Sequence, residues 1–122
     1  MNAAEVELTS QIEFNEKTWE TVCDERELTP NLGVRALVGG NQVALFRVQE
    51  SLYAISAIDP FTKAAVLSRG LIGELGGRVV VASPLYKQHF DLATGACLED
   101  SAVRVQTFPV RRVEGRVQVA IQ

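Results

Sequence analysis

The sequence predicts an all-β domain, an antiparallel β-sandwich with one short helix. Short apolar runs alternate with glycine-containing turns from residue 19 onward, which is typical of antiparallel sheets. The length of 122 residues fits one domain, and 47% hydrophobic with 22% charged residues is ordinary for a soluble globular protein. We therefore expect a single domain over residues 19–122. Residues 1–18 lack a clear apolar period and are predicted to be a flexible extension.

The first predicted strands form a meander. Residues 33–38 and 42–48 flank Gly39-Gly40-Asn41, and glycine and asparagine tolerate the positive φ of a tight hairpin turn. Along the second run, Ala44, Phe46 and Val48 share one face, and Val43, Leu45 and Arg47 share the other. Further strands are expected at residues 52–58, 78–82, 88–92, 110–113 and 116–121.

Two local features complete the predicted architecture. Alternation within residues 88–92 directs Phe90 and Leu92 inward, and His89 and Asp91 outward. Only residues 63–69 are predicted to be helical, in a turn or two that Gly70 ends.

Charge and composition exclude several classes of function. The net charge is −3, and the first thirty residues are the acidic part of the chain. The basic residues show no interleaving with aromatic side chains, which argues against binding to nucleic acid. No apolar run is long enough to span a bilayer, and the N-terminus lacks a basic start and an apolar stretch, so we expect no membrane association and a cytoplasmic protein. Cys23 and Cys97 are expected to be reduced, packed side chains, although a disulfide between them is possible.

Catalytic and ligand-binding templates are also missing from the sequence. His89 is the only histidine, and a metal site built from His89 and Asp91 would need a third ligand. No glycine-rich phosphate loop and no nucleophile elbow occurs, so no catalytic residue and no small-molecule ligand is predicted. The arginines of the C-terminal third favour a solvated strand face, with anion binding as the alternative: Arg104, Arg111, Arg112 and Arg116.

A framework of short motifs resembles a known fold. Ala54-Ile55-Ser56, Leu67-Ser68-Arg69-Gly70 and Phe90-Asp91-Leu92-Ala93-Thr94-Gly95 occur in the order found in Rieske-type ferredoxins. The segments Ile58-Asp59-Pro60-Phe61 and Ala82-Ser83-Pro84-Leu85 are similar to those of a narrower group. That group is the small subunit of the cytoplasmic NAD(P)H-dependent nitrite reductase, a Rieske-like protein that lacks the iron-sulfur cluster.

The cluster-ligand positions of this framework are all changed. A Rieske centre takes thiolates on one iron and imidazoles on the other. The two cysteine positions are occupied here by Asp59 and Ser83, and the two histidine positions by Phe61 and Tyr86. A phenyl ring has no lone pair to donate, and one carboxylate cannot replace four ligands. We therefore expect a domain without cofactor or metal, in which Phe61 and Tyr86 fill the vacated space and Asp59 and Ser83 bind nearby backbone amides.

The resemblance implies a non-catalytic subunit of an oxidoreductase. Its partner is expected to be the large subunit, which carries FAD, siroheme and a 4Fe-4S cluster and reduces nitrite to ammonium in nitrate assimilation. The tip that holds the cluster in Rieske proteins is their docking surface, so the expected interface residues are Lys63, Arg69, Tyr86, Lys87 and His89. The alternatives are a freestanding Rieske-like interaction domain with another partner and, from another class, a small electron carrier with a different metal.

Overall fold

The computed structural model describes residues 18–85 and 87–121, so the proposed extension lies almost entirely outside the described residues. Thr18, which the sequence analysis placed in that extension, is the first residue of β1. The strands are β1 (Thr18–Asp24), β2 (Val34–Val38), β3 (Asn41–Val48), β4 (Ser51–Ser56), β5 (Leu71–Leu75), β6 (Arg78–Ala82), β7 (His89–Asp91), β8 (Val110–Val113) and β9 (Arg116–Ile121). Two 3₁₀ turns, η1 (Glu25–Glu27) and η2 (Leu67–Arg69), are the helical elements of this part of the chain.

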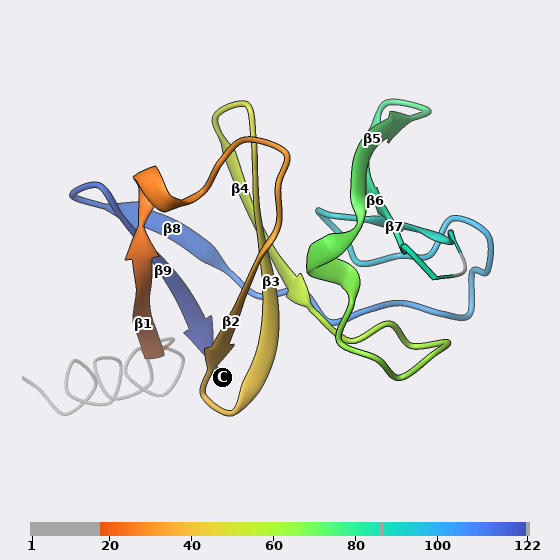
Figure 1. Cartoon of the computed structure of the whole chain (residues 1–122), viewed down its shortest axis with the longest axis horizontal. Coiled ribbons are helices and arrows are strands. Elements are labelled where there is room, and N and C mark those ends of the chain that lie inside the picture. The colour runs from red at the N-terminus through yellow and green to blue at the C-terminus, as the bar shows by residue number, and fades with distance from the viewer. Residues whose placement is uncertain (1–17, 86, 122) are drawn as a thin grey trace, which may run out of the picture.

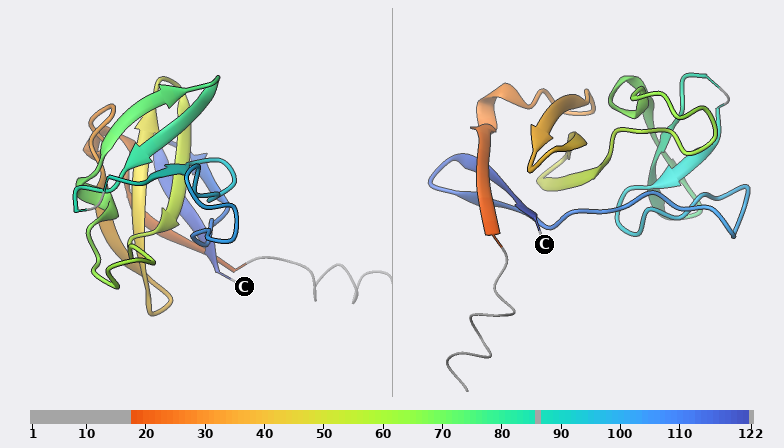
Figure 2. Two further views of the ribbon diagram at one scale, coloured as in Figure 1. Left: turned by 90° about the vertical axis from the view of Figure 1, so that its right-hand side faces the viewer. Right: turned by 90° about the horizontal axis from the view of Figure 1, so that it is seen from below.

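The strands form three antiparallel sheets of three strands each, with the orders β1-β9-β8, β2-β3-β4 and β5-β6-β7. Figure 1 shows them side by side, with the first sheet at the left, the second in the centre and the third at the right. The segment between β7 and β8 runs from the third sheet back to the first, along the lower edge of the view in Figure 2 (right). The prediction of an all-β antiparallel fold is confirmed.

Strand β3 separates two hydrophobic cores. Its side chains Ala44 and Phe46 belong to the core shared with the third sheet, whereas Val43 and Leu45 belong to the core shared with the first sheet. All four side chains have an exposed fraction of 0%. Because both faces of β3 are buried, apolar side chains occur on both faces of this strand. The first core is built from Ala44, Phe46, Ile55, Ala57, Leu67, Val81, Phe90, Leu92, Cys97 and Val105.

Two strands were missed by the sequence analysis, and both lie at the edge of a sheet. β1 and β5 are the outer strands of their sheets. Leu71 and Leu75 of β5 are 76% and 43% exposed. A strand that buries little of either face carries little of the alternating signal by which strands are recognised.

The predicted helix over residues 63–69 is wrong in extent. Only Leu67–Arg69 forms a 3₁₀ turn, and the Gly70 backbone amide closes it on Leu67. The residues before it belong to a loop in which Lys63 has a φ of 65°, a left-handed conformation incompatible with a continuous right-handed helix. Among the described residues, no helix is long and apolar enough to cross a membrane. Cys23 and Cys97 are both free thiols.

Candidate functional site

The first candidate loop follows β4 and is held by hydrogen bonds that start from Asp59. The Asp59 amide donates to the Ala64 carbonyl at 2.9 Å, and the Lys63 amide donates back to the Asp59 carbonyl at 2.7 Å. The Asp59 side chain accepts from the amide of Phe61 at 2.8 Å. The aspartate thus caps its own turn, as short polar side chains do at tight loops.

The second candidate loop connects β6 to β7 and repeats this arrangement. The Ser83 amide donates to the Gln88 carbonyl at 2.8 Å, and the Lys87 amide donates to the Ser83 carbonyl at 3.0 Å. The Ser83 hydroxyl accepts from the Leu85 amide at 3.4 Å. The two loops therefore have equivalent backbones, with Asp59 and Ser83 at matching positions. Tyr86, the fourth predicted ligand position, lies outside the described residues.

A direct hydrogen bond joins the two loops. The Ser83 hydroxyl donates to Oδ2 of Asp59 over 2.5 Å, across 24 residues of sequence. The exposed fractions of Asp59 and Ser83 are 0% and 1%. Each residue was expected to bind backbone amides, and both do so, but their bond to each other was not predicted. The signal was available, because both residues stand where two thiolates would bind the same iron and must therefore lie close together.

The side chains at these positions do not fit a [2Fe-2S] cluster. Oδ2 of Asp59 is bonded to Ser83, and Oδ1 accepts from the amides of Phe61 and Thr62. A direct hydrogen bond between the two thiolate positions occupies the space where an iron atom would have to bind. Phe61 offers no donor atom at all. The described residues also contain no group of three or more His, Cys, Asp or Glu side chains placed to hold a metal ion.

Phe61 covers the site only in part. Its ring lies 6.4 Å from that of Phe90 at an interplanar angle of 45°, so it contacts the edge of the first core. Its exposed fraction is 36%, however, and the expectation that this ring fills a closed space between the loops is therefore corrected. The fully buried groups of this site are Asp59 and Ser83, which bond to each other, and the phenyl ring packs beside Phe90 with part of its surface exposed.

Phe61→Ala is expected to lower the free energy of unfolding by about 1–2 kcal/mol, because a phenylalanine lost from a closed core costs about 3–5 kcal/mol and this ring is partly exposed. Urea denaturation measures the change, with Leu85→Ala, at a side chain that is 51% exposed, as the control. A loss above about 3 kcal/mol would show that the ring fills a closed space between the loops after all. A loss as small as that of the control would show that the ring has no packing role.

His89 forms a pair with Glu99 that the sequence analysis did not identify. The His89 amide donates to Oε1 of Glu99 at 2.8 Å, and the ring Nδ1 lies 2.6 Å from Oε2. The predicted outward position of Asp91 is wrong, because this residue is only 5% exposed. Its carboxylate accepts from the Ala93 amide at 2.8 Å and lies 3.7 Å from Arg78. His89 and Asp91 therefore do not form a metal site together.

The His89–Glu99 pair predicts a pH-dependent contribution to stability. Burial by itself would raise the pKa of Glu99, but hydrogen bonds from the His89 amide and ring outweigh it and hold that pKa below its usual 4.5. A lowered folded-state pKa stabilises the fold above about pH 4.5, and this contribution is lost as the pH falls through the folded value. The stability difference between wild type and Glu99→Gln should therefore be present at pH 7 and shrink at pH 3. An equal difference in stability at pH 7 and pH 3 would contradict a stabilising His89–Glu99 pair.

The predicted interface residues that the structure describes are mostly exposed. Lys63, Arg69 and Lys87 are exposed, and the His89 side chain is 32% exposed. Apolar side chains are exposed beside them on the same loops, with exposed fractions of 37% for Ile58, 36% for Phe61 and 51% for Leu85. We call the surface formed by the loops of residues 57–66 and 83–88 the tip. An exposed apolar patch with a charged border is typical of a protein-binding surface.

Two arginines of the C-terminal third, Arg111 and Arg112, are held by contacts within the described residues. The Arg111 guanidinium lies 3.9 Å from the centre of the Trp19 ring. Its Nε donates to Gln118 at 2.8 Å. Arg112 pairs with Glu25 at 2.8 Å, and this contact raises the pKa of Arg112 and lowers that of Glu25. These contacts favour the solvated strand face over the anion-binding alternative.

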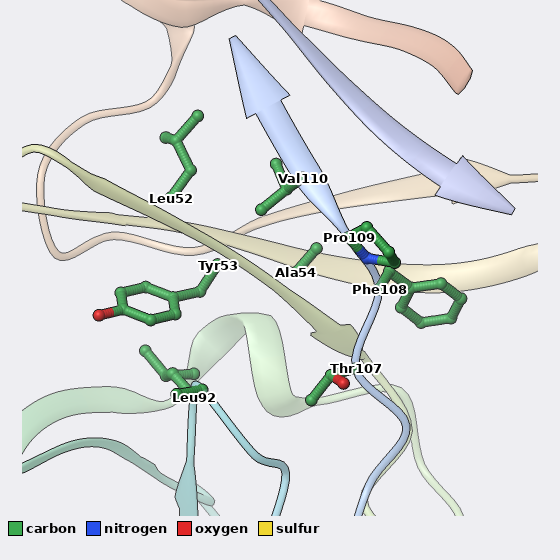
Figure 3. Close-up of a pocket in the computed structure, with 9 residues that line it drawn as sticks. Leu52, Tyr53, Ala54, Leu92, Thr107, Phe108, Pro109 and Val110 are labelled. Atoms are coloured by element: carbon green, nitrogen blue, oxygen red, sulfur yellow. The ribbon is translucent and has the colours of Figure 1, made fainter. Parts of the chain in front are cut away.

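A groove of ≈ 500 Å³ lies between β4, the turn after β7 and the start of β8. Figure 3 shows Leu52, Tyr53 and Leu92 on one side and Pro109 and Val110 on the other. Among the residues that the structure describes, no charged side chain lines it. Its polar side chains are the Tyr53 phenol and the Thr107 hydroxyl, and no charged acid or base of the lining stands beside them to activate either group.

Comparisons with known proteins agree with the Rieske-like fold of this chain. Residues 18–120 match the family model described as a Rieske-like [2Fe-2S] domain. The chain is 48% identical to the nitrite reductase (NADH) small subunit of Salmonella typhimurium over 103 residues, 83% of this chain and 95% of the relative. A crystal structure of an NADH-dependent nitrite reductase small subunit from Mycobacterium tuberculosis has a TM-score of 0.86 and 46% identity, covering 88% and 98% of the two chains.

A third relative carries a similar domain within a longer chain. The nitrite reductase [NAD(P)H] large subunit of Klebsiella oxytoca is 38% identical over 106 residues, which is 87% of this chain and 11% of that protein. The fold, the matched length and the identity to small subunits agree. The chain therefore belongs to the Rieske-like family of nitrite reductase small subunits.

Proposed function

We propose that this chain is the non-catalytic small subunit of a cytoplasmic NAD(P)H-dependent nitrite reductase, and that it docks on and supports the large subunit. The partner carries the flavin, siroheme and 4Fe-4S cluster and reduces nitrite to ammonium. The small subunit supplies no catalytic residue, and its contribution is the surface that it presents to the large subunit.

The Asp59–Ser83 hydrogen bond is the observation that carries the proposal. This hydrogen bond joins the two loops directly, at the place where a Rieske protein binds the cluster that carries its electrons. A scaffold that retains its loops without that chemistry is suited to binding a partner. The Klebsiella relative supports the choice of partner, because there a similar domain is part of a chain named as the large subunit.

Affinity purification of the tagged full chain from its own host tests the proposal. We expect a large protein to co-elute at a constant ratio and to carry flavin and siroheme absorption, while the isolated chain carries no stoichiometric iron. A chain that elutes alone, or with a partner lacking those chromophores, would overturn the proposal in favour of a freestanding interaction domain. Iron and visible absorption in the isolated chain would favour an electron carrier.

A further inference from the structure

A third loop of the same construction provides an internal comparison for the tip. The Asp91 amide donates to the Ala96 carbonyl at 2.9 Å, and the Gly95 amide donates to the Asp91 carbonyl at 2.7 Å. The Asp91 side chain accepts from the Ala93 amide at 2.8 Å. These are the hydrogen bonds that Asp59 and Ser83 form in the two tip loops. The same six-residue loop therefore occurs three times in the part of the chain that the structure describes.

The fifth residue of each loop has a left-handed backbone, and its identity differs between the loops. The φ angles are 65° at Lys63, 63° at Lys87 and 81° at Gly95. Glycine adopts this conformation without a steric penalty, whereas an L-residue with a side chain does so at a cost. The third loop uses the residue that its backbone favours. Both tip loops instead carry a lysine, although glycine would satisfy the same hydrogen bonds.

The two lysine side chains contribute no contact that would explain their presence. Lys63 and Lys87 are exposed, and neither side chain forms an ion pair or hydrogen bond with the described residues. They are two of only three lysines in the sequence. Unfavourable backbone conformations kept without a local structural benefit are found at functional positions. What remains for these residues to provide is their positive charge.

The charge distribution of the tip points to the sign of the partner surface. The tip and the residues that adjoin it, 67–70 and His89, contain one acidic residue, Asp59, and its side chain is fully buried. The exposed charges of these segments, Lys63, Arg69 and Lys87, are all positive, although the whole chain has a net charge of −3. Complementary charges across an interface raise the rate of association and fix the orientation of the partners.

We propose that Lys63 and Lys87 are a matched pair of cationic contacts for carboxylates on the large subunit, on either side of an apolar depression that receives Phe61 and Leu85. This inference rests on the proposed docking and adds the chemistry of the partner surface. Each of the two loops that meet at the Asp59–Ser83 hydrogen bond carries one of these lysines at its fifth position. The partner should therefore present acidic residues in two places rather than in one.

The double variant Lys63→Gly/Lys87→Gly tests the pair, because it removes both charges and leaves the backbone conformation favoured. We expect its thermal unfolding midpoint to equal or exceed that of wild type. Its association rate constant with the purified large subunit should fall about tenfold at low salt, with a weaker dependence on salt concentration. Lys63→Arg/Lys87→Arg should bind as wild type does.

Two matched controls separate charge and backbone effects. Arg26→Gln/Arg116→Gln removes the same charge from the opposite side of the molecule, around η1 and the β8–β9 turn (Figure 1), and should bind as wild type does. Gln49→Gly relieves a left-handed residue, with a φ of 55°, in the β3–β4 turn and should also leave binding unchanged.

The results that would overturn the pair differ from those that would overturn the docking itself. If the wild-type chain does not bind the large subunit, the proposed function is overturned. If the wild-type chain binds and the glycine variant binds with the same rate and the same salt dependence, the proposed lysine pair is overturned while the docking stands. A lowered unfolding midpoint in the glycine variant would also overturn it, because the lysines would then have a structural role.

Discussion

Asp59→Ala is expected to lower the free energy of unfolding by about 3 kcal/mol, because the substitution leaves one buried donor and one partly buried donor without an acceptor. The Ser83 hydroxyl loses its partner at 2.5 Å, and the Phe61 amide loses its partner at 2.8 Å. Urea denaturation followed by Trp19 fluorescence measures the change. Ser83→Ala should cost less, about 1–2 kcal/mol, because the carboxylate keeps its bonds to backbone amides.

The double variant Asp59→Ala/Ser83→Ala identifies the contact itself. Once both groups are removed, neither is left buried and unpaired, so the double variant should cost less than the sum of the two single variants. A coupling of about 1 kcal/mol or more is the expected size for residues in direct contact. Additive costs would mean that the two side chains stabilise their own loops without joining them.

Gly95→Ala is expected to cost about 4 kcal/mol, and Gly77→Ala about 1 kcal/mol. The two glycines have nearly the same φ, 81° and 79°. A Cβ atom at Gly95 would lie 2.1 Å from the Val105 carbonyl oxygen, whereas at Gly77 nothing lies within 4 Å. Thermal and urea unfolding of both variants measure the difference. Equal costs would show that the segment around Val105 can move aside.

The cost at Gly95 bears on the lysine pair as well. Gly95 is confined by a neighbouring carbonyl, and therefore no side chain fits there. Lys63 and Lys87 occupy the same loop position with their side chains exposed. The position itself tolerates a side chain only where the loop faces solvent, as it does at the tip.

The sequence predicted the fold through its buried strands. The alternation in β3 and in β9, where Val117, Val119 and Ile121 share a face, agrees with the buried positions because those faces are covered by other strands. The pattern failed at β1 and β5, where no residue is fully buried and the apolar alternation is therefore weak. It also failed at residues 63–66, where a left-handed lysine has no distinguishing pattern in the sequence.

The candidate site was located from the sequence, but its interactions were not. The positions of Asp59 and Ser83 followed from the family resemblance, which also implied that the two side chains lie close together, but their mutual hydrogen bond was not predicted. The His89–Glu99 pair joins β7 to a segment without regular structure, and nothing in the residue order indicates that contact. The equivalence of three loops was hidden because Ser83 and Asp59 differ in residue type while their backbones do not.

The position of β3 between the two cores has a consequence for the cooperativity of unfolding. Ala44 and Phe46 stabilise one half of the molecule, and Val43 and Leu45 stabilise the other, from a single strand of eight residues. Loss of packing in one core would therefore disturb the strand on which the other core depends. We expect the domain to unfold as one unit, so that stabilising either core should also protect the other.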